Sequence, residues 1–156
     1  MLVMRKLAVA VAAFALLVGA EAAAQVPSPF ARELAGQLAH AEPEVRSEGF
    51  MFVAGPFAGA LAQQRARQIN INLRAGQEYR FVGTCDSNCS DMDLRLFDPN
   101  GQQVAQDTAN DTTPMLRVRA ATTGPHRVEV AMYRCSATEC WYAFNVYSRW
   151  IGRPRP

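Results

Sequence analysis

Residues 91–105 read DMDLRLFDPNGQQVA, and this stretch does most to decide the fold. Met92, Leu94 and Leu96 recur at every second position, which is the pattern of a strand with one buried face. Residues 98–101 follow as Asp-Pro-Asn-Gly, a turn in which proline presets φ and glycine tolerates positive φ. We therefore predict an antiparallel hairpin that joins a strand at 92–97 to a short strand at 103–105.

The same alternation marks further segments on both sides of this hairpin. They are 69–73, 79–82, 116–120, 127–132 and 141–147. Turn-forming residues separate these segments, and no helical pattern lies between them. Several short strands with frequent turns indicate an all-β chain that forms an antiparallel sandwich or barrel.

An N-terminal segment, residues 25–48, has the periodicity of a helix instead. Its apolar residues recur every four positions, at Phe30, Leu34 and Leu38. Ser28 and Pro29 are suitable for the cap and the first turn of this helix, and Pro43 interrupts the pattern. We therefore expect a short helix that ends at Pro43.

The stretch 50–61 is apolar but is broken by glycine and proline, which indicates an irregular or edge strand. The expected organisation is a helical and irregular segment at 25–60, a sandwich at 61–149 and a disordered tail at 150–156.

Residues 1–24 have the pattern of an export signal. Arg5 and Lys6 precede an apolar run at 7–20, and the three alanines at 22–24 suit cleavage after Ala24. The run is shorter than the ~20 residues that span a bilayer. We predict a signal peptide at 1–24, no membrane span, and a location in the periplasm or the medium.

Composition excludes some functions and directs attention to one segment. The chain of 156 residues has a formal net charge of +2 and no run of basic residues, which argues against a nucleic-acid partner. Its two histidines leave little for a His-based catalytic or metal site. The segment 86–111, however, holds six aspartates against one arginine, on a body whose other charges are mainly arginine.

Four cysteines lie in two closely spaced pairs. Cys85 and Cys89 flank three residues, and Cys135 and Cys140 flank four. We favour a disulfide within each pair, because export leads to an oxidising compartment. A four-cysteine zinc site is the alternative. Neither spacing is the C-x-x-C of redox-active thiols.

Three motifs carry a family resemblance. Residues 73–79 (LRAGQEY), 91–101 (DMDLRLFDPNG) and 123–130 (TGPHRVEV) resemble, in order and spacing, the bacterial pre-peptidase C-terminal domain. The resemblance covers about 60–148. His126 stands where the family has an aromatic residue, and the two cysteine pairs are not part of the family pattern.

The resemblance implies a jelly-roll-like β-sandwich that assists secretion or binds substrate and is stabilised by calcium in some members. It does not imply peptidase activity. Because no peptidase precedes the domain in this chain, we expect a stand-alone secreted form, and we expect it to be a monomer.

The acidic segment suggests a calcium site. Asp91 and Asp93 are two residues apart on a predicted strand, so their side chains project from the same face. Calcium takes six to eight oxygen ligands from carboxylates, amides, carbonyls and water. Alternatively, these residues only form turns and accept backbone N–H bonds. The candidate ligands are Asp86, Asp91, Asp93, Asp107, Asn110 and Asp111.

Aromatic residues offer a second candidate surface. Tyr133, Trp141 and Tyr147 fall on the polar phase of the last two predicted strands. Exposed aromatic side chains stack on sugar rings or anchor protein interfaces. The alternative is ordinary cross-strand packing.

Catalysis has weaker support than binding. The serines lack the G-x-S-x-G context of a nucleophile, His40 lies in the predicted helix, and we expect His126 at the surface. We predict an exported, non-catalytic binding or accessory module, with calcium as a structural ion and an unknown protein or glycan as partner. The alternatives are a carbohydrate-binding module that uses Tyr133 and Trp141, and a small secreted hydrolase that uses a carboxylate pair.

Overall fold

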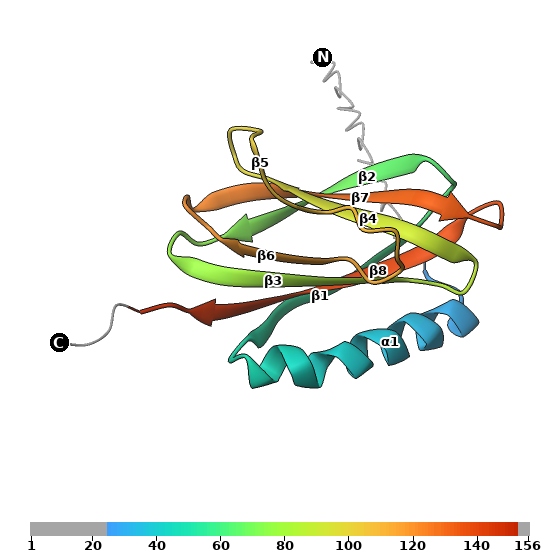
Figure 1. Cartoon of the computed structure of the whole chain (residues 1–156), viewed down its shortest axis with the longest axis horizontal. Helices are drawn as coiled ribbons and strands as arrows, with labels where there is room; N and C mark the ends of the chain where they lie inside the picture. The colour runs from blue at the N-terminus through green and yellow to red at the C-terminus, as the bar shows by residue number, and fades with distance from the viewer. Residues whose placement is uncertain (1–24, 153–156) are drawn as a thin grey trace, which may run out of the picture.

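The computed structural model describes residues 25–152 and contains one helix and eight strands (Figure 1). The predicted signal peptide at 1–24 and the end of the predicted tail lie outside the described residues. The elements are α1 (Ser28–Ser47), β1 (Met51–Leu61), β2 (Arg65–Leu73), β3 (Gln77–Cys85), β4 (Cys89–Phe97), β5 (Gln103–Asp107), β6 (Met115–Arg119), β7 (Gly124–Cys135) and β8 (Cys140–Trp150).

The strands form two antiparallel four-stranded sheets, which confirms the predicted fold class. Sheet A has the order β1-β8-β3-β6, and sheet B has the order β2-β7-β4-β5. This order is that of a jelly roll, in which successive strands mostly alternate between the two sheets. Helix α1 lies against the outer face of sheet A, so the molecule has three layers (Figure 1).

The predicted hairpin is present, with β4 paired to β5 across the Asp-Pro-Asn-Gly turn. The carboxylate of Asp98 holds this turn, because its Oδ1 accepts N–H bonds from Asn100 and Gln102, each at 2.9 Å.

The main core lies between the two sheets and follows the period-two pattern. Met92, Leu94 and Leu96 of β4 are all fully buried there, and the corresponding inward positions of β7 and β8 are equally buried. Burial of alternating apolar side chains from both sheets is the principal driving force for this packing. The sequence pattern of residues 91–105 therefore fixes which face of β4 points into the core.

A second core lies between α1 and sheet A. Three helix residues, Leu34, Leu38 and Val45, pack with Phe50, Val82 and Tyr147. The predicted helix end was wrong, because α1 continues through Pro43 to Ser47. Proline removes one backbone hydrogen bond, but Pro43 is exposed, and burial of Val45 in the next turn holds the helix in place.

The sandwich also begins earlier than the predicted boundary at residue 61. Residues 51–61 form β1, which pairs with β8 at the edge of sheet A. The expectation of an edge strand with irregularities is confirmed, since the register shifts between Phe52 and Ala54 and again between Ala54 and Phe57.

The cysteines form the two predicted local disulfides, Cys85–Cys89 and Cys135–Cys140. The first joins β3 to β4 and the second joins β7 to β8, so each links one sheet to the other.

An ionic network holds the C-terminal end of α1 against sheet A. Glu78 accepts hydrogen bonds from Nε of Arg117 at 2.5 Å and Nε of Arg149 at 2.6 Å. Glu48, just after the helix, pairs with Arg80 and Arg117. The Arg117 bond, followed by Arg149, lowers the pKa of Glu78 below its usual value, against the effect of its burial.

Candidate functional site

A cleft of about 450 Å³ opens on the outer face of sheet B, the face that α1 does not cover (Figure 1). Three residues come from β4, one from β5, two from the loop between β5 and β6, and two from β7. The lining residues are Asp91, Asp93, Arg95, Gln106, Thr108, Asn110, Tyr133 and Arg134.

Two carboxylates form the acidic part of the cleft. Asp91 and Asp93 face outward because the residues between and after them, Met92 and Leu94, face the core. Each aspartate is nevertheless only 5% exposed. The β4–β7 register is irregular around Asp91, which lies opposite Arg134. A β-bulge of this kind commonly re-aims a side chain at a functional site.

The two carboxylates differ in their partners. Oδ2 of Asp93 accepts a hydrogen bond from Arg95 at 2.9 Å, and Arg95 also reaches Glu129 at 3.3 Å. Burial raises the pKa of Asp93, and the attraction of Arg95 opposes that shift. Oδ1 of Asp91 is buried and has no hydrogen-bond partner.

The unpaired oxygen of Asp91 is unusual for its position. Buried polar atoms are nearly always hydrogen-bonded, because an unsatisfied one loses its hydration without compensation. Two other buried side-chain oxygens in residues 25–152 also lack a partner, those of Tyr142 and Asn145, but neither residue lines this cleft. Asp91 therefore brings an unused acceptor into the wall of an open cleft.

Tyr133 adds an exposed aromatic surface to the same place. Its side chain lies on β7, is 53% exposed, and lines both this cleft and the adjoining hollow that Arg65 and Ala66 border. Three residues of the predicted calcium set and one of the predicted aromatic set thus meet here, although the sequence placed them in different hypotheses.

Only half of the predicted acidic set lies in the cleft. Asp91, Asp93 and Asn110 line it. Asp107 instead accepts N–H bonds from Ala109 at 3.1 Å and Met115 at 2.8 Å, and Asp111 accepts one from Thr113 at 2.9 Å. These two aspartates hold the loop between β5 and β6, as the turn-forming alternative predicts.

Asp86 also has a local structural role. Its Oδ1 accepts the N–H of Asn88 at 2.9 Å, and its Oδ2 accepts the N–H of Trp141 at 2.8 Å. The carboxylate is 1% exposed and ties the β3–β4 turn to β8. Within residues 25–152, no group of three or more His, Cys, Asp or Glu side chains is arranged to hold a metal ion.

The three predicted aromatic residues do not share a face. Trp141 and Tyr147 point to the outer side of sheet A, where α1 covers them, whereas Tyr133 lies on sheet B. Trp141 stacks on Phe30 of the helix with ring centroids 6.2 Å apart, and Tyr147 is 1% exposed. The expectation of an exposed face that includes these two residues was wrong, because the helix buries it.

The expectation of a surface His126 was also wrong. The residue is 2% exposed, with Nδ1 of its ring 3.1 Å from the carbonyl oxygen of Gly124. His40 lies in α1, as predicted, and is exposed.

Sequence reasoning missed Arg95, Arg134, Gln106 and Thr108 as part of the site. Strand parity could have found the first, since Arg95 shares the outward face of Asp91 and Asp93. Arg134 could not be found this way, because its place depends on the non-local pairing of β4 with β7.

No family model matches this chain, and no curated protein matches it. The chain is similar to a solved structure, that of Aeromonas hydrophila PliG, described as a periplasmic lysozyme inhibitor of g-type lysozyme. The identity is 14%, the TM-score is 0.46, and the match covers 64% of this chain and 92% of that chain. A likeness this distant carries no conclusion about function. Within residues 25–152, no helix is long and apolar enough to cross a bilayer.

Proposed function

We propose that this chain is an exported, non-catalytic binding module whose ligand occupies the cleft beside Asp91 and Asp93. The signal-peptide pattern at 1–24 and the two disulfides support export. The single observation that carries the binding proposal is the buried, unpaired Oδ1 of Asp91 at an open cleft. A ligand that supplies a proton donor or a cation there satisfies this oxygen.

The geometry favours binding over glycoside hydrolysis. The two carboxylates project side by side from one strand, and Asp93 forms an ion pair with Arg95. Hydrolysis of a glycosidic bond requires two carboxyl groups that flank the bond, one of them as an acid or base free to exchange a proton. Side-by-side carboxylates, with one held in an ion pair, are better suited to hold a ligand.

Calcium is the ligand that the acidic residues favour first. Its side-chain ligands are then Asp91 and Asp93, with oxygens of Asn110, Thr108 and Gln106 close by in the cleft. Asp86, Asp107 and Asp111 are not part of this set, because they do not line the cleft and instead accept backbone N–H bonds. The ion stabilises the loop between β5 and β6 by joining it to β4.

A carbohydrate is the second candidate, and Tyr133 is the observation that favours it. A sugar ring stacks on the exposed tyrosine face, while its hydroxyl groups donate to Oδ1 of Asp91 and accept from Arg134. Trp141 has no part in this version, because α1 covers it.

Thermal unfolding of the oxidised mature protein in EDTA, in 1 mM CaCl2 and in 1 mM MgCl2 tests the calcium version. A site with a Kd of ~10 μM adds about 2.7 kcal/mol at 1 mM calcium, which raises Tm by on the order of 10 °C. The expected result is a shift with calcium only, lost in Asp91→Asn and kept in Glu139→Gln, a variant of an exposed carboxylate elsewhere.

Binding to a panel of soluble oligosaccharides, measured by calorimetry with wild type, Tyr133→Ala and Asp91→Asn, tests the carbohydrate version. We expect either variant to weaken binding at least tenfold. A protein that responds neither to calcium nor to any member of the panel, or that responds equally in Asp91→Asn, contradicts the proposed ligands of this cleft.

A further inference from the structure

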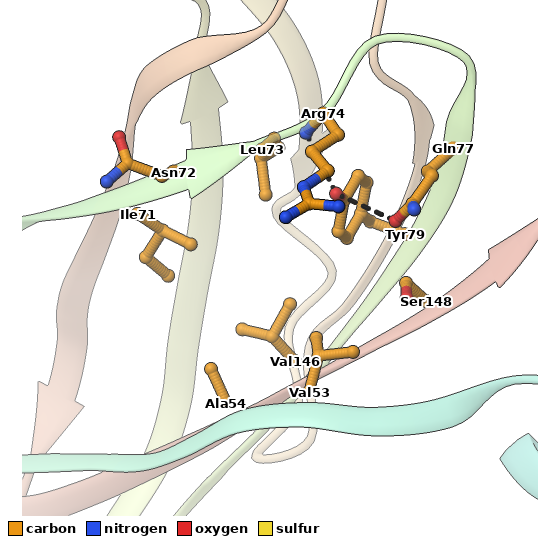
Figure 2. A pocket seen from close by; sticks show the side chains of 10 residues that line it. All are labelled: Val53, Ala54, Ile71, Asn72, Leu73, Arg74, Gln77, Tyr79, Val146 and Ser148. Atoms are coloured by element: carbon orange, nitrogen blue, oxygen red, sulfur yellow. Dashed lines mark hydrogen bonds between the residues drawn. The ribbon is translucent and has the colours of Figure 1, made fainter.

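A second cavity, of about 320 Å³, lies between the two sheets where the free edges of β1 and β2 face each other (Figure 2). Its interior is apolar, formed by Ile71 and Leu73 of β2, Tyr79 of β3 and Val146 of β8, which are all at most 8% exposed. Val53 and Ala54 of β1 form one side of the mouth. The cavity shares no residue with the Asp91 cleft.

The β1 edge beside this cavity is exposed and hydrophobic. β1 is at the end of sheet A, so within residues 25–152 only its β8 side is paired. Met51, Phe52 and Val53 are 59%, 45% and 49% exposed. An unpaired strand edge presents N–H and C=O groups to a further strand, and exposed apolar residues along it form a place to bury an apolar partner.

The charged groups at this edge are basic. Arg74 extends over Tyr79 toward the cavity, and its backbone N–H donates to the Tyr79 hydroxyl at 2.9 Å (Figure 2). Arg65 and Arg67 lie along β2 and are exposed. Neither β1 nor β2 contains an aspartate or a glutamate. This part of the surface therefore favours an acidic partner over a basic one.

We propose that the β1–β2 edge is a docking site for an extended segment of a partner protein that combines apolar and acidic side chains. Its backbone pairs with Met51–Ala54, one apolar side chain enters the cavity, and a neighbouring carboxylate reaches Arg74. This is strand addition, in which backbone hydrogen bonds provide affinity and a pocket selects the side chain.

A second copy of this chain is a poor occupant of the edge. Two copies would bring the arginines of their β2 strands near each other, and like charges disfavour that contact. Pro56 has no N–H to donate, and the two register shifts limit continuous pairing along β1 to short stretches. A short segment anchored by one buried side chain avoids both difficulties.

Selection from a displayed library of random peptides tests the proposal, with peptides of 11 residues, the length of β1. The bait is the oxidised mature protein. We expect the selected peptides to alternate apolar residues with aspartate or glutamate. A synthetic copy of one selected peptide should bind at least tenfold more weakly to the Val53→Asp and Arg74→Glu variants than to wild type. A second copy, with lysine in place of the acidic residues, should bind Arg74→Glu better than it binds wild type.

Two variants serve as controls. Arg119→Glu makes the same charge change at an exposed position of β6 and should leave binding unchanged. Asp91→Asn should also leave peptide binding unchanged, which separates this site from the cleft on sheet B. Circular dichroism melts confirm that each variant folds. The proposal is overturned if no peptide is enriched on the wild-type bait relative to the Val53→Asp bait, or if the selected peptides are basic. It is also overturned if Arg119→Glu weakens binding as much as Arg74→Glu. Sedimentation that shows a dimer lost in Val53→Asp also overturns it, because the edge then belongs to a second copy.

Discussion

Both outer faces of the sandwich are formed by alternate residues of their strands, but α1 covers only the face of sheet A. The outer face of sheet A carries Val82, Ala143 and Tyr147, and α1 covers it with Leu34 and Leu38. The outer face of sheet B carries Asp91, Asp93 and Tyr133, and among residues 25–152 no helix covers it. A helix that buries one face leaves the other as the place where a partner can bind. We therefore propose that the outer face of sheet A contributes stability and that the outer face of sheet B binds the ligand of the Asp91 cleft, separately from the β1–β2 edge.

One pair of tyrosines provides the sharpest test of this difference. Tyr147→Ala removes a fully packed side chain under the helix, so we expect a loss of about 3–5 kcal/mol in the free energy of unfolding. Tyr133→Ala removes a side chain that is 53% exposed, so its effect should stay within about 0.5 kcal/mol. Urea unfolding of both variants measures the two values, and similar losses would remove the distinction between the faces.

A pair of buried aspartates separates structural from binding carboxylates. Asp86→Asn replaces an oxygen that accepts a backbone N–H by an amide that cannot, so it should cost about 1–3 kcal/mol. Asp91→Asn breaks no hydrogen bond at the unpaired Oδ1 and removes a buried charge, so the unliganded protein should be at least as stable as wild type. A large loss of stability in Asp91→Asn, measured in EDTA, would make Asp91 structural.

The two faces should also respond oppositely to pH. The pKa of Glu78, on the helix-covered face, is lowered on folding, so its contribution to stability is present above its unfolded pKa and is lost as pH falls through the folded pKa. The pKa of Asp93, in the cleft, is raised, so its contribution is present below its unfolded pKa and is lost as pH rises through the folded pKa.

Urea unfolding between pH 3 and pH 7 distinguishes these two contributions. Glu78→Gln should lose less stability than wild type as the pH falls from 7 to 3. Asp93→Asn should lose more stability than wild type, because wild type gains stability when Asp93 is protonated. Identical pH profiles for the two variants would show that the two carboxyl groups have similar environments.

The sequence predicted most of the fold because its signals are local. The alternation at residues 91–105 and the Asp-Pro-Asn-Gly turn specify β4, β5 and their pairing. The helix end was misplaced because proline is a local signal, and burial of Val45 outweighs it. His126 was misplaced for a similar reason, since a polar residue after a turn says nothing about what packs over it.

The candidate site was predicted in part, and its missing half is non-local. Asp91 and Asp93 share a face by strand parity alone, but Tyr133 joins them only because β7 pairs with β4. Trp141 and Tyr147 have the same outward parity as a binding face, and only the docking of α1 shows that they are covered. Strand parity therefore identifies which residues share a face of the sheet, and the tertiary structure determines whether another element covers that face.

The most direct test of ligand binding in the Asp91 cleft is an amide NMR titration of the oxidised mature protein with calcium and with the oligosaccharide panel. We predict that a binding ligand shifts signals of β4, β7 and the loop between β5 and β6, leaves those of α1 unchanged, and has no effect on Asp91→Asn. Shifts centred on α1 and sheet A, or a response that persists in Asp91→Asn, would contradict the assignment of binding to the Asp91 cleft.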